Sequence, residues 1–166
     1  MTSLADLNAL DRDAIEAALS GPPEQAAAFI RAAAEAGHAE AQVMLGQILL
    51  DGRGVSADAV QALQWFIKAA QQGHAMAMNM VGRSYENGWG IAADAARAAE
   101  WYRAAAERGL DWGLYNLATL LTLGNGVAED KAEALALFRR AADLGHAKSI
   151  NMIGSFYEDG WIVSRD

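Results

Sequence analysis

Three histidines are the first side chains in this sequence whose type and spacing suggest metal binding or proton transfer. His38, His74 and His146 each follow a glycine, and successive members lie 36 and 72 residues apart. The ligands of a zinc ion must lie about 2.0–2.1 Å from it, whereas equivalent positions in stacked helix pairs are separated by two helix spacings of about 8–10 Å. We therefore expect no shared ion and interpret the three histidines as contacts at helix starts or turns.

Carboxylates and glycine-rich loops are the other candidates for chemistry. Glu40, Glu86, Glu158 and Asp159 have no carboxylate partner fixed by spacing, so they do not predict an acid–base pair. No basic residue recurs in the Gly-x-Gly loops, which argues against phosphate binding, and neither a nucleophile-elbow, a Walker nor an H-E-x-x-H motif occurs. The sequence therefore predicts no catalytic residue, no metal site and no cofactor.

The charge of the chain narrows the class of partner. Thirteen basic and 21 acidic residues give a net charge of −8, which disfavours nucleic acids and anionic membrane surfaces as partners. The chain contains no cysteine and therefore forms no disulfide. The N-terminal residues lack the basic and apolar regions of a signal peptide, so we expect a cytoplasmic protein, or a periplasmic or secreted one if terminal segments have been removed.

Composition predicts a helical domain with a substantial core. The 166 residues are 53% hydrophobic and include two prolines and many alanines, which favour helix. No apolar run reaches 18 residues, so no membrane-spanning helix is expected.

The chain also repeats itself with a period of 36 residues. Gly52 recurs as Gly88, Gly124 and Gly160; Asp58 recurs as Asp94, Asp130 and Asp166; Leu45-Gly46 recurs as Val81-Gly82, Leu117-Ala118 and Ile153-Gly154; Trp65-Phe66 recurs as Trp101-Tyr102 and Leu137-Phe138. Each unit predicts two helices, at 39–50 and 59–72 in the first complete copy. Gly52 suits a left-handed helix end and Asp58 a helix start. A single pair cannot bury its apolar face, so the pairs must stack.

This pattern closely resembles the Sel-one-like repeat, a relative of the tetratricopeptide repeat. The resemblance implies an all-α, right-handed α/α superhelical solenoid of stacked antiparallel helix pairs. We expect one structural domain, divided into a degenerate N-terminal repeat or cap (1–38), three repeats (39–74, 75–110, 111–146) and a partial fourth repeat (147–166). Such proteins are known mostly as interaction scaffolds, so the resemblance implies a protein or peptide partner and no catalysis.

By analogy with tetratricopeptide repeats, the first helices line a concave groove. The groove positions that this analogy implies are Glu40, Val43, Gln47, Leu50, Met76, Asn79, Arg83, Glu86, Trp112, Tyr115, Thr119, Thr122, Lys148, Asn151, Ser155 and Glu158. Aromatic residues are frequent binding anchors, amides can bond a peptide backbone, and Arg83 can pair with a carboxylate. The alternative is structural: Asn79 and Asn151 bond neighbouring side chains, and Trp112 packs between units.

Two loop tryptophans and the end of the chain suggest further contacts. Trp89 and Trp161 lie 72 residues apart at equivalent loop positions, where each either covers the core of its unit or forms an interaction edge. The fourth unit lacks its second helix, which would leave part of the surface formed by Ile150, Ile153, Phe156 and Tyr157 exposed. Either the Trp161-Ile162-Val163 segment folds back over them, a second molecule covers them, or the natural chain continues. The second case makes a homodimer and a self-associating structural or regulatory module the alternative function.

Overall fold

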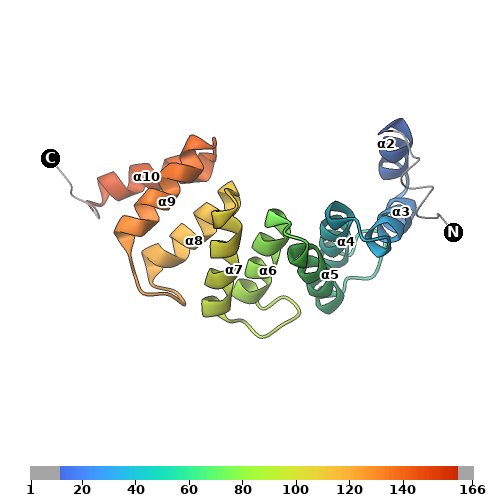
Figure 1. Ribbon diagram of the computed structural model, residues 1–166, viewed down its shortest axis with the longest axis horizontal. Coiled ribbons are helices and arrows are strands. Elements are labelled where there is room, and N and C mark those ends of the chain that lie inside the picture. The colour runs from blue at the N-terminus through green and yellow to red at the C-terminus, as the bar shows by residue number, and fades with distance from the viewer. Residues whose placement is uncertain (1–11, 161–166) are drawn as a thin grey trace.

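The computed structural model describes residues 12–160, with side chains from residue 16 onward, and all regular structure in this range is α-helical. The helices are α2 (Arg12–Ser20), α3 (Pro23–Glu35), α4 (Ala39–Asp51), α5 (Ala59–Gln71), α6 (Ala75–Asn87), α7 (Ala95–Glu107), α8 (Asp111–Leu123), α9 (Lys131–Asp143) and α10 (Ala147–Glu158). They follow one another along the longest axis of the molecule, from α2 near one end to α10 near the other (Figure 1).

The two-helix unit predicted from the repeat is confirmed. The first helices α4, α6, α8 and α10 begin 36 residues apart, and so do the second helices α3, α5, α7 and α9. Each helix packs chiefly on its neighbours in the sequence, which makes the fold a solenoid. Helix α2 is an exception to the register, because it begins only 27 residues before α4.

Both ends of the loop within each unit have the expected caps. Gly52, Gly88 and Gly124 end their helices with φ between 65° and 72°, the left-handed region that favours glycine. Asp58, Asp94 and Asp130 begin the next helices, and each carboxylate accepts a hydrogen bond from the backbone amide three residues later. The backbone amide of Asp58 also donates to the Leu49 carbonyl at 2.8 Å, which ties the loop to the helix before it.

The second loop glycine has a role that the sequence analysis did not anticipate. It packs against the start of the second helix of the preceding unit. A Cβ placed on Gly54 would lie 2.3 Å from the Pro23 carbonyl oxygen, and one on Gly90 would lie 2.4 Å from the Ala59 carbonyl oxygen. Gly126 approaches Ala95 in the same way. These glycines therefore set how closely successive units stack.

Small residues and aromatic rings form the contact between the two helices of a unit. Gly46 and Gly82 lie under the rings of Phe66 and Tyr102, where a Cβ would come within 2.4 Å and 2.6 Å of a ring carbon. Phe66, Tyr102 and the equivalent Phe138 are fully buried. Because no side chain separates these rings from the facing backbone, the two helices approach closely.

We predict opposite effects for alanine at two equivalent helical glycines. Gly82→Ala should lower the free energy of unfolding by about 1–3 kcal/mol, because the new methyl group overlaps the buried Tyr102 ring. Gly154→Ala should raise it by about 0.5–1 kcal/mol, because no described atom outside its own helix lies within 4 Å of the added Cβ. Urea unfolding of both variants measures this difference, and equal effects would contradict the packing described.

A second pair of variants tests the contact between units. Gly90 and Gly109 both have positive φ, at 75° and 77°, so alanine carries a similar backbone cost of about 1–2 kcal/mol at each. Only at Gly90 does the new methyl group also meet backbone of the neighbouring unit. We expect Gly90→Ala to be less stable than Gly109→Ala by a further 1–3 kcal/mol or so in thermal or urea unfolding. Similar stabilities would show that this contact does not set the stacking.

Candidate functional site

A pocket of about 290 Å³ lies across the first helices of three successive units. Its lining consists of Met76, Asn79, Met80 and Arg83 from α6, Trp112, Tyr115 and Asn116 from α8, and Lys148 from α10. Six of these eight residues are groove positions expected from the sequence; Met80 and Asn116 are not. The repeat explains how they meet, because Met76, Trp112 and Lys148 occupy the same place in their units, and Asn79 and Tyr115 lie one turn further along.

The aromatic wall of the pocket is held by a buried histidine. The Trp112 and Tyr115 rings meet edge to face with centroids 6.0 Å apart, and the His146 ring lies 4.5 Å and 4.9 Å from them. His146 is buried, and its Nδ1 accepts a hydrogen bond from the Ser149 amide at the start of α10. One side chain therefore caps a helix and also supports the two aromatic residues.

The expected role of the histidines at helix starts is confirmed for His74 as well. Its Nδ1 accepts from the Ala77 amide, and its Nε2 lies 2.7 Å from a Glu40 carboxylate oxygen. His38 precedes α4 without a side-chain capping bond. Within the described residues, no group of three His, Asp or Glu side chains is arranged to hold a metal ion.

The two cations of the pocket lie over tryptophan rings. Lys148 Nζ is 5.2 Å from the centroid of Trp112, and the Arg83 guanidinium carbon is 5.1 Å from that of Trp89. Neither cation forms an ion pair with a carboxylate from the part of the chain that the structure describes. Trp89 is half-buried and belongs to neither apolar cluster of the core.

Two amides bridge α6 and α8 within the pocket. Asn116 Nδ2 donates to Asn79 Oδ1 at 2.8 Å, and Asn79 is buried. The structural alternative for Asn79, a bond to a neighbouring side chain, is therefore present. Each amide retains one group for a ligand: the Asn79 amide nitrogen can donate, and the Asn116 oxygen can accept.

The remaining groove positions lie outside this pocket. Four of them use their side chains or backbone locally: Glu86 accepts a hydrogen bond from the Tyr102 hydroxyl, the Thr119 hydroxyl donates to the Tyr115 carbonyl, and the Ser155 hydroxyl donates to the Asn151 carbonyl. Thr122 was wrongly expected in the groove; it is buried, and its hydroxyl donates to the Ala118 carbonyl. Trp161 and Ile162 lie outside the described residues.

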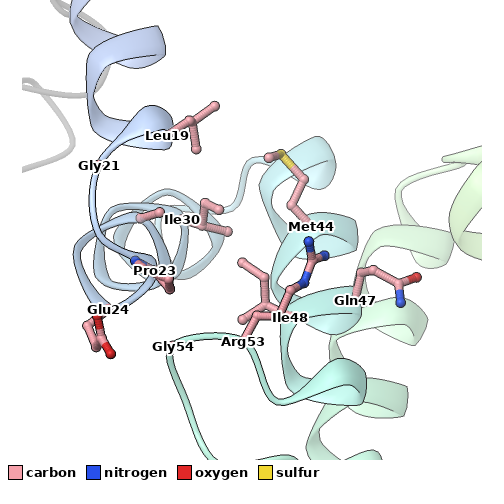
Figure 2. A pocket seen from close by; sticks show the side chains of 11 residues that line it. Leu19, Gly21, Pro23, Glu24, Ile30, Met44, Gln47, Ile48, Arg53 and Gly54 are labelled. Atoms are coloured by element: carbon pink, nitrogen blue, oxygen red, sulfur yellow. The ribbon is translucent and has the colours of Figure 1, made fainter.

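A second, larger pocket of about 540 Å³ lies near the N-terminal end, between α2, α3 and α4. Figure 2 shows Leu19, Ile30, Met44 and Ile48 around an apolar space, with Arg53 at its edge. Arg53 already pairs with Asp51 at 3.3 Å. Gln47, expected in the groove, lines this pocket and donates to Asp51. Few polar groups converge here, so this cavity offers less specificity than the one across α6, α8 and α10.

No helix within residues 12–160 is long and apolar enough to cross a bilayer.

Among the described residues, Tyr102 has the one pronounced pKa shift. Burial, and secondarily its hydrogen bond to Glu86, raises the pKa of the Tyr102 hydroxyl far above its usual value near 10. This pair secures Glu86 at the rim of the helix pair formed by α6 and α7.

This architecture is similar to that of known repeat proteins. The model of the Sel1 repeat matches residues 23–38, 39–74, 75–110 and 113–146. Among solved structures, the chain is 29% identical to c5321, described as a protective antigen of uropathogenic Escherichia coli with an SLR fold. That match has a TM-score of 0.82 and covers 93% of this chain and 34% of the other.

A Sel1 repeat protein from Oxalobacter formigenes is 31% identical, with a TM-score of 0.72 and coverage of 85% of this chain and 61% of that one. Cysteine rich protein B of Helicobacter pylori shares the fold at 22% identity, with a TM-score of 0.65 and coverage of 80% and 98%. The chain thus spans about a third of the first and three fifths of the second. A search of curated proteins found no match.

The Tyr102 environment predicts a dependence of stability on alkaline pH. In the unfolded chain a tyrosine ionises near pH 10, whereas the folded protein holds the Tyr102 proton to higher pH. The stability that Tyr102 contributes is therefore complete below about pH 10 and is lost as the pH rises further. We expect the advantage of wild type over Tyr102→Phe in unfolding free energy to shrink by about 1.4 kcal/mol per pH unit above that point. A difference that stays constant from about pH 8 to pH 11 would contradict this.

Proposed function

The chain belongs to the Sel1 repeat family, and from that premise we propose that it binds a protein or peptide in the pocket across α6, α8 and α10. Sel1 repeat proteins are generally protein–protein interaction scaffolds without catalytic activity. The observation that supports this site is that six expected groove residues line one pocket. Three of them, Met76, Trp112 and Lys148, occupy the same helix position in successive units.

The pocket has the composition of an anchoring site. Trp112 keeps about 37% of its surface exposed, although its ring meets the His146 and Tyr115 rings edge to face. A rigid, partly exposed aromatic residue loses little conformational entropy on binding, and such residues dominate many interfaces. The amide pair of Asn79 and Asn116 adds a donor and an acceptor for a peptide backbone.

Self-association through α10 is the second candidate. Ile150 and Tyr157 are 54% and 57% exposed on this helix, which favours a contact there. Phe156 does not contribute to this surface, because it is buried against Phe138 with ring centroids 5.7 Å apart. The fold-back cap expected from Trp161 to Val163 lies outside the described residues.

We predict that Trp112→Ala/Tyr115→Ala abolishes partner capture while the fold persists. Both side chains are outside the fully buried core, and losing two aromatic anchors should cost about 2 kcal/mol or more of binding free energy, roughly 30-fold in affinity. The measurement is affinity capture from a lysate of the source organism, followed by titration of the captured protein against wild type and variant. Asn79 is left unchanged because it is buried and bonded.

Ile150→Ala/Tyr157→Ala is the matched control, since it removes two exposed apolar side chains from the other candidate surface. Capture that survives in this control but not in the pocket variant supports the proposal. Two results would favour self-association through α10 over binding in the pocket. In the first, only the α10 variant loses capture. In the second, the mass measured by sedimentation rises with concentration in wild type and in the pocket variant but not in the α10 variant.

A further inference from the structure

We propose that the pocket across α6, α8 and α10 selects an acidic segment, in which Asp or Glu side chains flank an apolar or aromatic residue. This inference rests on the proposed function and names the chemistry of the partner. It assigns the Arg83 and Lys148 cations to the carboxylates, the aromatic wall to the apolar residue, and the amide pair to the peptide backbone.

The charge of the pocket favours an acidic partner. The chain has a net charge of −8, yet the eight residues that line this pocket include two cations and no acid. The nearest acids in the sequence, Glu86 and Asp111, are not among these lining residues, and neither forms an ion pair with either cation of the pocket within the described residues. Glu86 accepts from the Tyr102 hydroxyl, and Asp111 accepts from the Trp112 amide at 2.7 Å. The lining of the pocket is therefore positive on an acidic protein and complementary to carboxylates.

The two cations of the pocket lie on different helices. Arg83 belongs to α6 and Lys148 to α10, and α8 lies between these helices along the row (Figure 1). Each cation rests on a tryptophan ring, which orients it without neutralising its charge. Two cations on separate helices suit carboxylates from different residues of a passing segment better than one carboxylate at a chain end.

The aromatic wall of the pocket suits the apolar residue of the segment. Trp112 and Tyr115 offer an apolar surface on α8, the first helix of the unit between those that carry the two cations, and Met76 and Met80 also line the pocket. Asn79 can donate from its free amide nitrogen, and Asn116 can accept at its free oxygen. An extended segment presents successive side chains to opposite faces and a backbone donor and acceptor at each residue, so it can use both kinds of group.

The test is a library of random peptides of about seven residues, long enough at ~3.3 Å per residue to cross two helix spacings. The peptides are N-acetylated and attached through their C-termini, so that only side chains supply carboxylates. We expect wild type to enrich peptides with Asp or Glu near Trp, Phe or Leu. Soluble, C-terminally amidated copies of the selected peptides should bind about tenfold more weakly when Glu is replaced by Gln. The unsubstituted acidic peptides should bind more weakly in high salt than in low salt.

The decisive variant is Arg83→Gln/Lys148→Gln, which should lose acidic selectivity and about tenfold or more in affinity. Its control is Lys68→Gln/Arg139→Gln, which also removes one lysine and one arginine charge. These two cations lie over aromatic rings outside the pocket, 4.4 Å from the Trp65 ring centroid and 6.0 Å from that of Tyr157. The control should retain both selectivity and affinity.

Other outcomes overturn the inference in distinguishable ways. Enrichment of apolar or basic peptides, lost in Trp112→Ala/Tyr115→Ala, would refute the acidic partner and leave the proposed pocket intact. Binding confined to a parallel array with free C-termini would assign the cations to a terminal carboxylate instead. If the decisive variant and its control lose equal affinity for acidic peptides, the binding depends on the overall charge of the protein and not on the pocket. If wild type selects nothing beyond the Trp112→Ala/Tyr115→Ala variant, both the inference and the proposed function fail.

Discussion

The rest of the structure depends on backbone contact at glycines, where no side chain separates neighbouring elements. Gly90 lies in the left-handed region against the start of α5, and Gly54 and Gly126 repeat this contact in the adjacent units. Such an approach fixes the offset between units more firmly than side-chain packing does, because backbone atoms cannot adopt another rotamer. The same offset brings Met76, Trp112 and Lys148 onto one surface, so the pocket is a consequence of the stacking.

The repeat separates the residues that build the fold from those that can differ. The glycines, the buried rings and the capping aspartates satisfy the needs of each helix pair, which leaves the outward positions of the first helices free to vary. The pocket uses that freedom on three helices at once. Its support is also taken from the fold, since His146 caps α10 and holds the aromatic wall with the same ring.

Prediction from sequence succeeded where one residue type answers one local physical need. A glycine at a left-handed helix end and an aspartate at a helix start depend only on nearby backbone, so the boundaries at Gly52 and Asp58 were predictable. It failed at positions that depart from the repeat. Asn116 was not expected in the pocket, and its bond to Asn79 joins residues 37 apart, which is not the repeat period. Thr122 is buried although its position follows the implied groove pattern. The histidines before α6 and α10 were a usable signal of capping, whereas His38 before α4 makes no side-chain capping bond and Leu110 precedes α8. Nothing in the sequence pointed to the ring contacts of His146.

The pairing of charged side chains at the pocket also depends on the residues that build the core. On an exposed helix face, arginine and lysine commonly pair with acids three or four residues away, and Arg97 with Asp94 shows such a pair here at 3.5 Å. Arg83 has an acid at that spacing, Glu86, but this carboxylate accepts a hydrogen bond from the buried Tyr102 hydroxyl. The buried phenol between α6 and α7 thus donates a hydrogen bond to the acid that could pair with Arg83, and Arg83 lies over Trp89 without an ion pair among the described residues. Core packing therefore influences how the charged side chains of the surface are paired.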